Sequence, residues 1–171
     1  MNALEIYAAQ ARYNRWMNDK VYGVSALLTG QERRRDLGAF FKSVHGTLNH
    51  LLLADRIWLA RFGAMPAPAF KSLSQELYDD FETLRAERRK TDDVLDAFVA
   101  GLTEAKLAAP ITYTRSGGEV RHPLWYGVTH LFNHQTHHRG QVTTLLVQLG
   151  RDPGVTDMIA LLRGDVPQKL L

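Results

Sequence analysis

Apolar residues recur at intervals of three and four along most of the chain, which is the spacing of amphipathic helices. One such segment covers residues 4–28 and stops at a Thr-Gly pair. A second covers residues 39–62 and ends at a glycine followed by a turn with two prolines. A third covers residues 72–100 and begins with a Ser and a Gln at capping-box spacing. The first hundred residues are therefore expected to form three long helices.

The pattern changes at residues 111–122, where two short segments flank a Ser-Gly-Gly turn, as in a β-hairpin. Pro123 suits the first turn of a fourth helix, which is expected over residues 123–149. Residues 156–163 favour a last short helix, and the six residues VPQKLL after Asp165 are expected to be a tail. The second half thus supplies one long helix after a hairpin.

These elements predict an all-α protein with a four-helix bundle and a long connection, containing the hairpin, between the third and fourth helices. Helices of about 25 residues are about 37 Å long, which suits a bundle. A chain of 171 residues is long enough for one domain and too short for two ordinary ones, so residues 1–171 are expected to form a single domain.

Composition and charge narrow the class of protein. No run approaches the ~20 apolar residues of a membrane helix, and the N-terminus lacks the plan of a signal peptide, so a cytoplasmic location is expected. The net charge of +3 comes from scattered residues. Nucleic acid is therefore an unlikely partner, and no membrane partner is expected. Cysteine is absent, which excludes disulfides and thiolate ligands from the chain itself.

Histidines are concentrated in the segment HLFNHQTHHRGQ, in the predicted fourth helix. On a helical wheel His138 falls inside the apolar arc and His134 lies at its edge. Two histidines at this i, i+4 spacing lie on one helix face and can bind one ion. His130 and His137 lie toward the border of the face and are weaker candidates.

A divalent ion needs a further ligand, which the second helix can supply. The solvated sector of that helix is expected to centre on His45, Asn49 and Arg56. His50 lies outside this sector, so we select His50 as the third ligand. Gly46 is small and would let a neighbouring helix or a ligand approach closely.

A single inward histidine is more often a hydrogen-bonded core residue than a ligand. Three inward histidines from two helices favour a shared metal ion, because burying several imidazoles without a partner leaves polar atoms unsatisfied. Asp55 lies among apolar positions and is expected to form a buried salt bridge with an arginine such as Arg12, Arg15 or Arg139. The alternative for Asp55 is to orient a ligand histidine.

Several motifs carry a family resemblance. The segments LNHLLLADRIWLARF, NHQTHHRGQ and GVTDMIALLR, with YNRWMN near the start, resemble the DinB-like family of metalloproteins over essentially the whole chain. The resemblance implies a four-helix bundle, commonly a homodimer, with three histidines around a divalent metal. Carried onto this sequence, the three are His50, His134 and His138. Related bundles include metal-dependent transferases and isomerases that use thiols such as mycothiol or bacillithiol.

The leading hypothesis is a metal-dependent enzyme with zinc or nickel, which transfers a low-molecular-weight thiol to a small electrophile or hydrolyses a small substrate. No side chain is assigned as a general base. One alternative is a noncatalytic, dimeric, stress-related bundle with a structural or adventitious metal, and another is a stress-related protein that sequesters a ligand. A homodimer is also favoured because the helix at residues 39–62 is apolar over most of its circumference.

Overall fold

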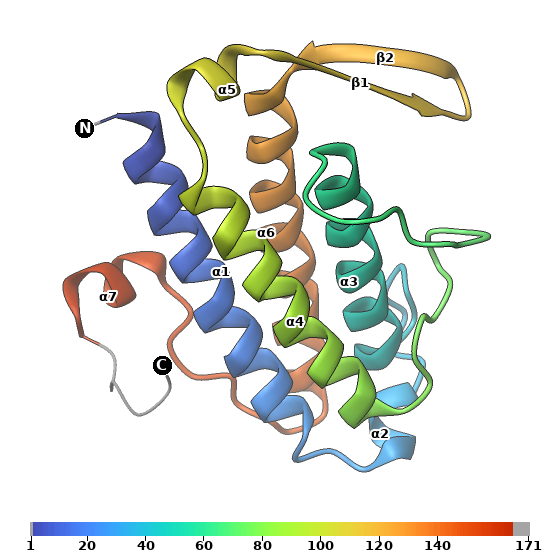
Figure 1. The fold of residues 1–171 in the computed structure, drawn as a ribbon. Helices are drawn as coiled ribbons and strands as arrows, with labels where there is room; N and C mark the ends of the chain where they lie inside the picture. Colours follow the sequence, from blue (N-terminus) through green and yellow to red (C-terminus); the bar gives the residue numbers. More distant parts are fainter. Residues whose placement is uncertain (1, 166–171) are drawn as a thin grey trace.

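The computed structural model describes residues 2–165, which contain seven helices and one two-stranded antiparallel sheet (Figure 1). Four long helices form a bundle, in which α1 and α3 each pack against both α4 and α6. The expected helical bundle is confirmed. The long helices are α1 (Ala3–Ser25), α3 (Val44–Arg61), α4 (Phe81–Ala100) and α6 (Leu124–Gln148).

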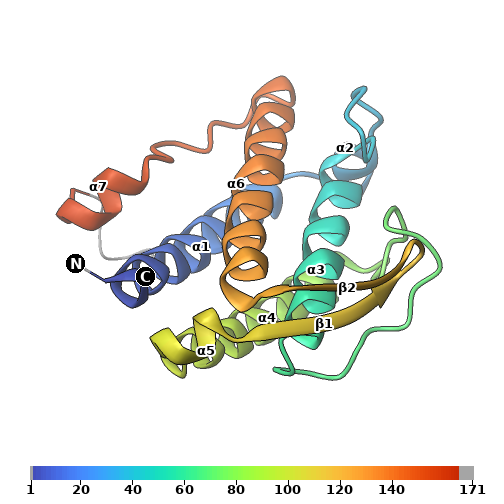
Figure 2. The same ribbon diagram turned by 90° about the horizontal axis from the view of Figure 1, so that it is seen from above.

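The hairpin crosses one end of this bundle, as Figure 2 shows from above. Its strands pair in the register that places Tyr113 opposite Val120, and the Ser-Gly turn lies between them, as the sequence predicts. The shorter elements are α2 (Gly30–Arg34), α5 (Glu104–Ala108), β1 (Pro110–Arg115), β2 (Gly118–Pro123) and α7 (Met158–Arg163). The sequence did not predict α2 or α5. The predicted tail VPQKLL lies outside the described residues.

Two helix starts differ from the sequence prediction. Residues 39–43 form a turn, and Ser43 caps α3 by accepting a hydrogen bond from the Gly46 N–H at 3.0 Å. The third long helix begins at Phe81 instead of residue 72, capped by Asp80. The expected capping box at residues 72–75 is wrong, because the Gln75 side chain accepts from the Lys71 N–H and residues 72–80 form part of a loop.

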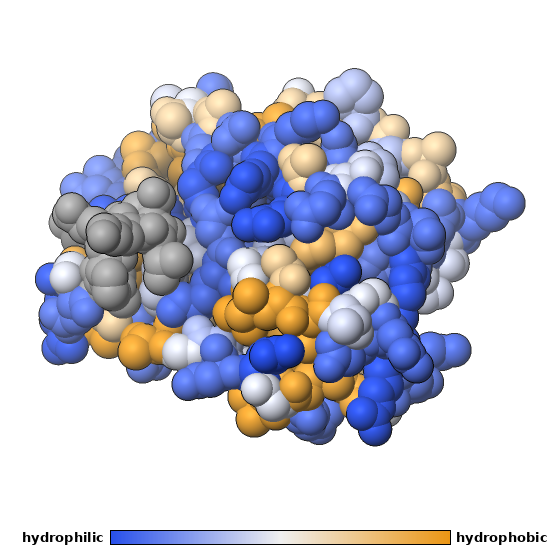
Figure 3. Space-filling view, turned by 90° about the horizontal axis from the view of Figure 1, so that it is seen from below, coloured by the Kyte–Doolittle hydropathy of each residue, from blue (hydrophilic) through white to orange (hydrophobic). Residues whose placement is uncertain are grey.

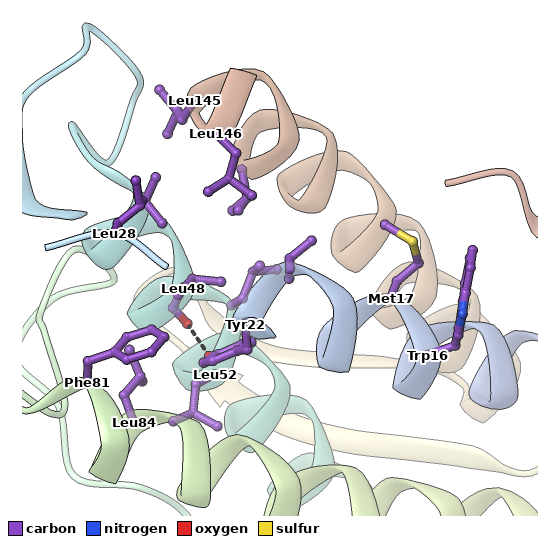
Figure 4. Packing of buried hydrophobic residues seen from close by; sticks show 14 of the residues in the cluster. Trp16, Met17, Tyr22, Leu28, Leu48, Leu52, Phe81, Leu84, Leu145 and Leu146 are labelled. Carbon is purple, nitrogen blue, oxygen red and sulfur yellow. Dashed lines mark hydrogen bonds between the residues drawn. The ribbon is translucent and has the colours of Figure 1, made fainter. Parts of the chain in front are cut away.

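The apolar core fills the space between the long helices. One cluster of buried side chains joins α1, α3, α4 and α6, with Trp16 and Leu48 among its members (Figure 4). In the same cluster the Tyr22 hydroxyl donates to the backbone carbonyl of Leu48 at 3.4 Å. A second cluster lies toward the hairpin end and includes Leu59 and Leu131. Burial of these side chains fixes how α3 and α6 face each other.

A buried polar network lies beside this core. The Arg88 guanidinium, 2% exposed, contacts Asp55 at 2.7 Å and Asp92 at 2.8 Å. Asp55 thus forms the expected buried salt bridge, but the predicted partners were wrong, because the arginine comes from α4. Arg139 is also buried and donates to neutral oxygens, among them Oδ1 of Asn14. Two arginines and two aspartates therefore share one interior region.

The apolar circumference of α3 is covered by the chain itself. Its buried side chains meet α4, α6, α2 and the loop before α4, so this circumference does not require a second subunit. The sequence argument for a dimer from this helix therefore fails, although the resemblance that implied a dimer is unaffected. Within residues 2–165, no helix is both long and apolar enough to cross a membrane.

Replacing Asp55 tests how much the buried polar network contributes to the free energy of unfolding. Asp55→Ala leaves the Arg88 charge buried with one carboxylate fewer, and we expect a loss of about 3–5 kcal/mol in the free energy of unfolding, measured by urea denaturation. Asp93→Ala is the matched control, because Asp93 is 69% exposed where it pairs with Arg15 at 2.7 Å. The control should cost less than about 1 kcal/mol. Equal costs for the two variants would contradict this reading.

Candidate metal centre

Three histidines meet between α3 and α6. His50 comes from α3, and His134 and His138 come from successive turns of α6. Each offers a ring nitrogen, and these three atoms lie within 4.8 Å of one another. His50 and His138 are buried, whereas His134 is half-buried. The structure thus brings together the three residues that the sequence singled out.

The rings are oriented by hydrogen bonds on their outer sides. The Nδ1–H of His50 donates to the Leu73 carbonyl at 2.9 Å, because a carbonyl can only accept. The Nδ1 of His138 lies 2.7 Å from the Gln141 side-chain oxygen and donates to it in the same way. In a neutral imidazole this leaves the lone pair on Nε2. Both rings therefore present an acceptor nitrogen to the centre of the cluster.

The spacing of one pair of inner nitrogens fits a small divalent ion. The Nε2 atoms of His50 and His134 are 3.2 Å apart. Two nitrogens bound to a tetrahedral zinc ion at ~2.0–2.1 Å are about 3.3 Å apart, so the observed separation matches. Without an ion, the His134 Nε2–H donates to His50, whose Nε2 has no hydrogen to give. The same pair of atoms can therefore share either a proton or a metal.

Burial keeps the three rings neutral. It lowers the pKa of His50 and of His138, and it lowers the pKa of His134 to about 3 with the help of the neighbouring imidazoles. Among residues 2–165, the main causes of these shifts are burial, other imidazoles and hydrogen bonds to Leu73 and Gln141, and none is a carboxylate. At neutral pH all three rings are therefore uncharged, which is the charge state that binding of a metal ion requires.

The loop that supplies the Leu73 carbonyl is attached to α3 by side chains that the sequence analysis placed in water. Asn49 is fully buried, and its oxygen accepts from the N–H groups of Leu77 and Tyr78 at 2.8 and 3.0 Å. His45 is 1% exposed, with its Nε2 3.0 Å from the Tyr78 carbonyl. The predicted solvated sector is therefore wrong at His45 and Asn49, because both serve the backbone of this loop.

The turn at residues 39–43 passes close to Gly46, and the Phe41 ring of this turn covers another side of the histidine cluster. The Phe41 ring stacks on the His50 ring, with centroids 3.8 Å apart and an angle of 16° between the planes. A Cβ at Gly46 would lie 2.3 Å from the Phe41 carbonyl oxygen, so the turn can reach this position only over a glycine. The close approach predicted at Gly46 is present, but the partner is the preceding turn and not another helix or a ligand.

The two weaker histidine candidates lie beside the cluster and outside the grouping. The His130 ring packs on Trp58 at 4.9 Å and lies 5.6 Å from the His134 ring. His137 is exposed, with its Nε2 3.3 Å from the Gln141 amide nitrogen. Gln141 therefore touches both His137 and His138. In the sequence Gln141 lies one helical turn after His137, and this spacing could have identified Gln141 as a partner of the histidines.

A family model described as the DinB family matches residues 2–169. This chain belongs to the DinB family. A curated relative, Protein DinB of Bacillus subtilis (strain 168), is 24% identical over 151 residues, which cover 85% of this chain and 87% of the relative. The sequence resemblance is thus confirmed at the level of the family.

A solved structure shares the fold of this DinB family member. It is a DinB-like protein from Bacillus cereus ATCC 10987, with a TM-score of 0.62 and 21% identity. The match covers 82% of this chain and 91% of the other. At this identity the likeness concerns the fold alone, and the chemistry of the site must be argued from the residues themselves.

Gly46→Ala tests how the turn is positioned. The added methyl group would collide with the Phe41 carbonyl, and we expect a loss of about 1–3 kcal/mol in the free energy of unfolding. Gly23→Ala in α1 is the control, since a Cβ there meets no atom within 4 Å. It should be neutral or stabilising by up to about 1 kcal/mol. If Gly46→Ala unfolds at the wild-type urea concentration, the close approach does not hold the turn.

Proposed function

We propose that His50, His134 and His138 hold one divalent ion, zinc or nickel, and that the protein is a metal-dependent enzyme. The observation that carries the proposal is the convergence of three neutral imidazoles, two of them with outer nitrogens fixed by hydrogen bonds. Such outer contacts raise the basicity of a ligand and fix its direction. A core histidine also needs hydrogen bonds, so the argument for a metal rests on the convergence of three ring nitrogens from two helices.

The composition of the grouping favours catalysis over a structural role for the metal. Within residues 2–165 the grouping has three members, and none is a carboxylate. Structural zinc sites are usually closed by four protein ligands, whereas catalytic sites commonly have three. A metal taken up only during purification is the remaining alternative.

The chemistry follows from three neutral ligands. An ion that keeps its full +2 charge lowers the pKa of a thiol or a water molecule beside it. His50, His134 and His138 set the position of that charge, and the Phe41 ring excludes water from one side of His50. Because the chain has no cysteine, a reacting thiol must be a low-molecular-weight cosubstrate such as bacillithiol or mycothiol. Its acceptor would be a small electrophile, and hydrolysis is the alternative at the same site.

Replacing each histidine tests the ligand assignment. His50→Ala, His134→Ala and His138→Ala should each weaken zinc binding by more than about 100-fold, which exceeds the 10–100-fold cost of losing an outer partner. Calorimetric titration of chelator-treated protein measures the affinity. His137→Ala is the matched control on the same helix, and its effect should be much smaller. The assignment fails if His137→Ala weakens binding as much as His138→Ala does.

Cobalt-substituted protein tests the proposed thiol chemistry. Addition of the cognate thiol should change the absorption spectrum of the bound cobalt, because the thiolate joins its ligands. Turnover of a model electrophile should disappear in His50→Ala. If bacillithiol, mycothiol, glutathione and coenzyme A all leave the spectrum unchanged, thiol transfer is the wrong reaction. Metal-dependent hydrolysis then becomes the leading proposal.

A homodimer is part of the same proposal. The family resemblance implies it, and α3 no longer supports it. The face seen from below is mostly hydrophilic, with apolar surface gathered in the lower half of the view (Figure 3). Apolar surface of this kind is compatible with contact to a second subunit.

A further inference from the structure

A cavity of about 590 Å³ lies between α1, α6 and the segment that carries α7, and none of the three clustered histidines lines it. Pockets of this size hold small organic molecules. Its α7 side is attached to α1 by the Tyr13 hydroxyl, which donates to the Thr156 carbonyl at 2.8 Å. Met158 of α7 forms part of the wall. The cavity is thus a separate place in the fold from the candidate metal centre.

Aromatic side chains form part of the walls of the cavity. Tyr13, Trp125, Tyr126 and Phe132 all line it. Trp125 and Tyr126 are 45% and 51% exposed, which is high for side chains of their size. Among the described residues, no Asp or Glu lines the cavity. The walls therefore favour a ligand with a flat apolar body and offer no counter-charge to a cation.

Arg139 stands at the wall of this cavity with part of its guanidinium unused. The group is 2% exposed, and its Nη1 donates to side-chain oxygens of Asn14 and Gln135. Within residues 2–165, Nη2 has only Thr136, at 3.5 Å, and Nε has no acceptor. Nε and Nη2 form one edge of the guanidinium plane, the edge to which a carboxylate binds with two parallel hydrogen bonds. A buried donor edge without an acceptor is costly unless something else occupies it.

Arg88, which is equally buried, differs from Arg139 in having two acids in contact. Burial alone would lower the pKa of Arg88, but Asp92 and Asp55 raise it above its usual value. Among residues 2–165, no carboxylate contacts the Arg139 guanidinium, whose hydrogen-bond acceptors are neutral side-chain oxygens. The two equally buried arginines thus differ in whether an acid lies in contact. The Tyr13 ring, 5.4 Å from Cζ of Arg139, joins this charge to the aromatic wall.

A buried acceptor adds a second requirement. The side-chain oxygen of Gln10, which also lines the cavity, has no hydrogen-bond partner in the described part of the chain. We propose that the cavity binds a small aromatic carboxylic acid that carries a hydroxyl or N–H group. The carboxylate pairs with the Nε and Nη2 edge of Arg139, the ring packs against Tyr13 and Trp125, and the donor group serves Gln10. This site does not depend on the metal.

The probe pair 4-hydroxyphenylacetate and 4-hydroxyphenylacetamide separates the charge from the ring. Isothermal titration calorimetry on the protein as purified should show binding of the acid and at least 10-fold weaker binding of the amide. Arg139→Gln should remove this preference. Equal affinities for the two probes, or no binding of the acid at millimolar concentration, would overturn the proposal.

Because Arg139 belongs to a buried network, its variant can fail to fold, and a surface variant keeps the test decisive. Asn133 is an exposed residue of the lining, and Asn133→Phe should fill the cavity and weaken binding of the acid by at least 10-fold. Thr144→Phe is the matched control, since Thr144 is exposed on α6 outside the lining. An unchanged affinity in Asn133→Phe would place the acid elsewhere.

His134→Ala separates this site from the candidate metal centre. The acid should bind to this variant with wild-type affinity, because the cavity lining does not include His134. Loss of binding in His134→Ala would show that binding of the acid depends on the histidine cluster and would overturn the proposal. Failure of metal binding in the same variant tests only the proposed enzyme, so the two results are independent.

Discussion

The hydrogen bond from Nδ1 of His50 to the Leu73 carbonyl connects the candidate site to the rest of the fold. It fixes which nitrogen of His50 faces α6, and it depends on a loop that has no regular structure of its own at this point. Asn49 attaches the loop to α3 by binding the backbone of Leu77 and Tyr78. Three polar side chains on one helix, His45, Asn49 and His50, thereby hold a segment that would otherwise leave buried backbone groups unpaired.

Helix α6 divides two kinds of polar chemistry between its faces. His134 and His138 point to α3, where burial and the neighbouring imidazoles lower their pKa values. Arg139 follows His138 directly, about 100° further around the helix, and lies in the network shared with α1 and α4. The carboxylates Asp55 and Asp92 belong to Arg88. Because these two carboxylates pair with Arg88, they are not part of the histidine cluster, and its three neutral nitrogens can bind an ion.

The sequence predicted what depends on local periodicity. The four long helices, the hairpin and the i, i+4 pair in α6 all follow from the spacing of apolar and polar residues within one segment. We selected His50 because it lies outside the sector of the helix that was predicted to face water. The prediction that this sector faces water is wrong at His45 and Asn49. A helical wheel separates polar from apolar faces, but it cannot tell water from the backbone of a loop that covers the helix.

The remaining differences between the sequence prediction and the structure depend on contacts between residues that are far apart in the sequence. Arg88 is 33 residues from Asp55, and nothing near Asp55 in the sequence marks its partner among the many arginines. Leu73 contributes its backbone carbonyl, which every residue has, so its residue type does not indicate this role. Helix α4 begins later than the sequence predicts. Asn49 binds the two backbone N–H groups just before it, at Leu77 and Tyr78. Such contacts are visible only when the segments have been placed in space.

The central claim is that the three histidines form a metal site. Anomalous diffraction at the zinc and nickel edges, on crystals of protein purified without immobilised nickel, tests it most directly. The account predicts one peak about 2 Å from Nε2 of His50, His134 and His138, with no fourth protein ligand. A metal-free cluster with His134 hydrogen-bonded to His50, or a peak at other residues, would contradict it.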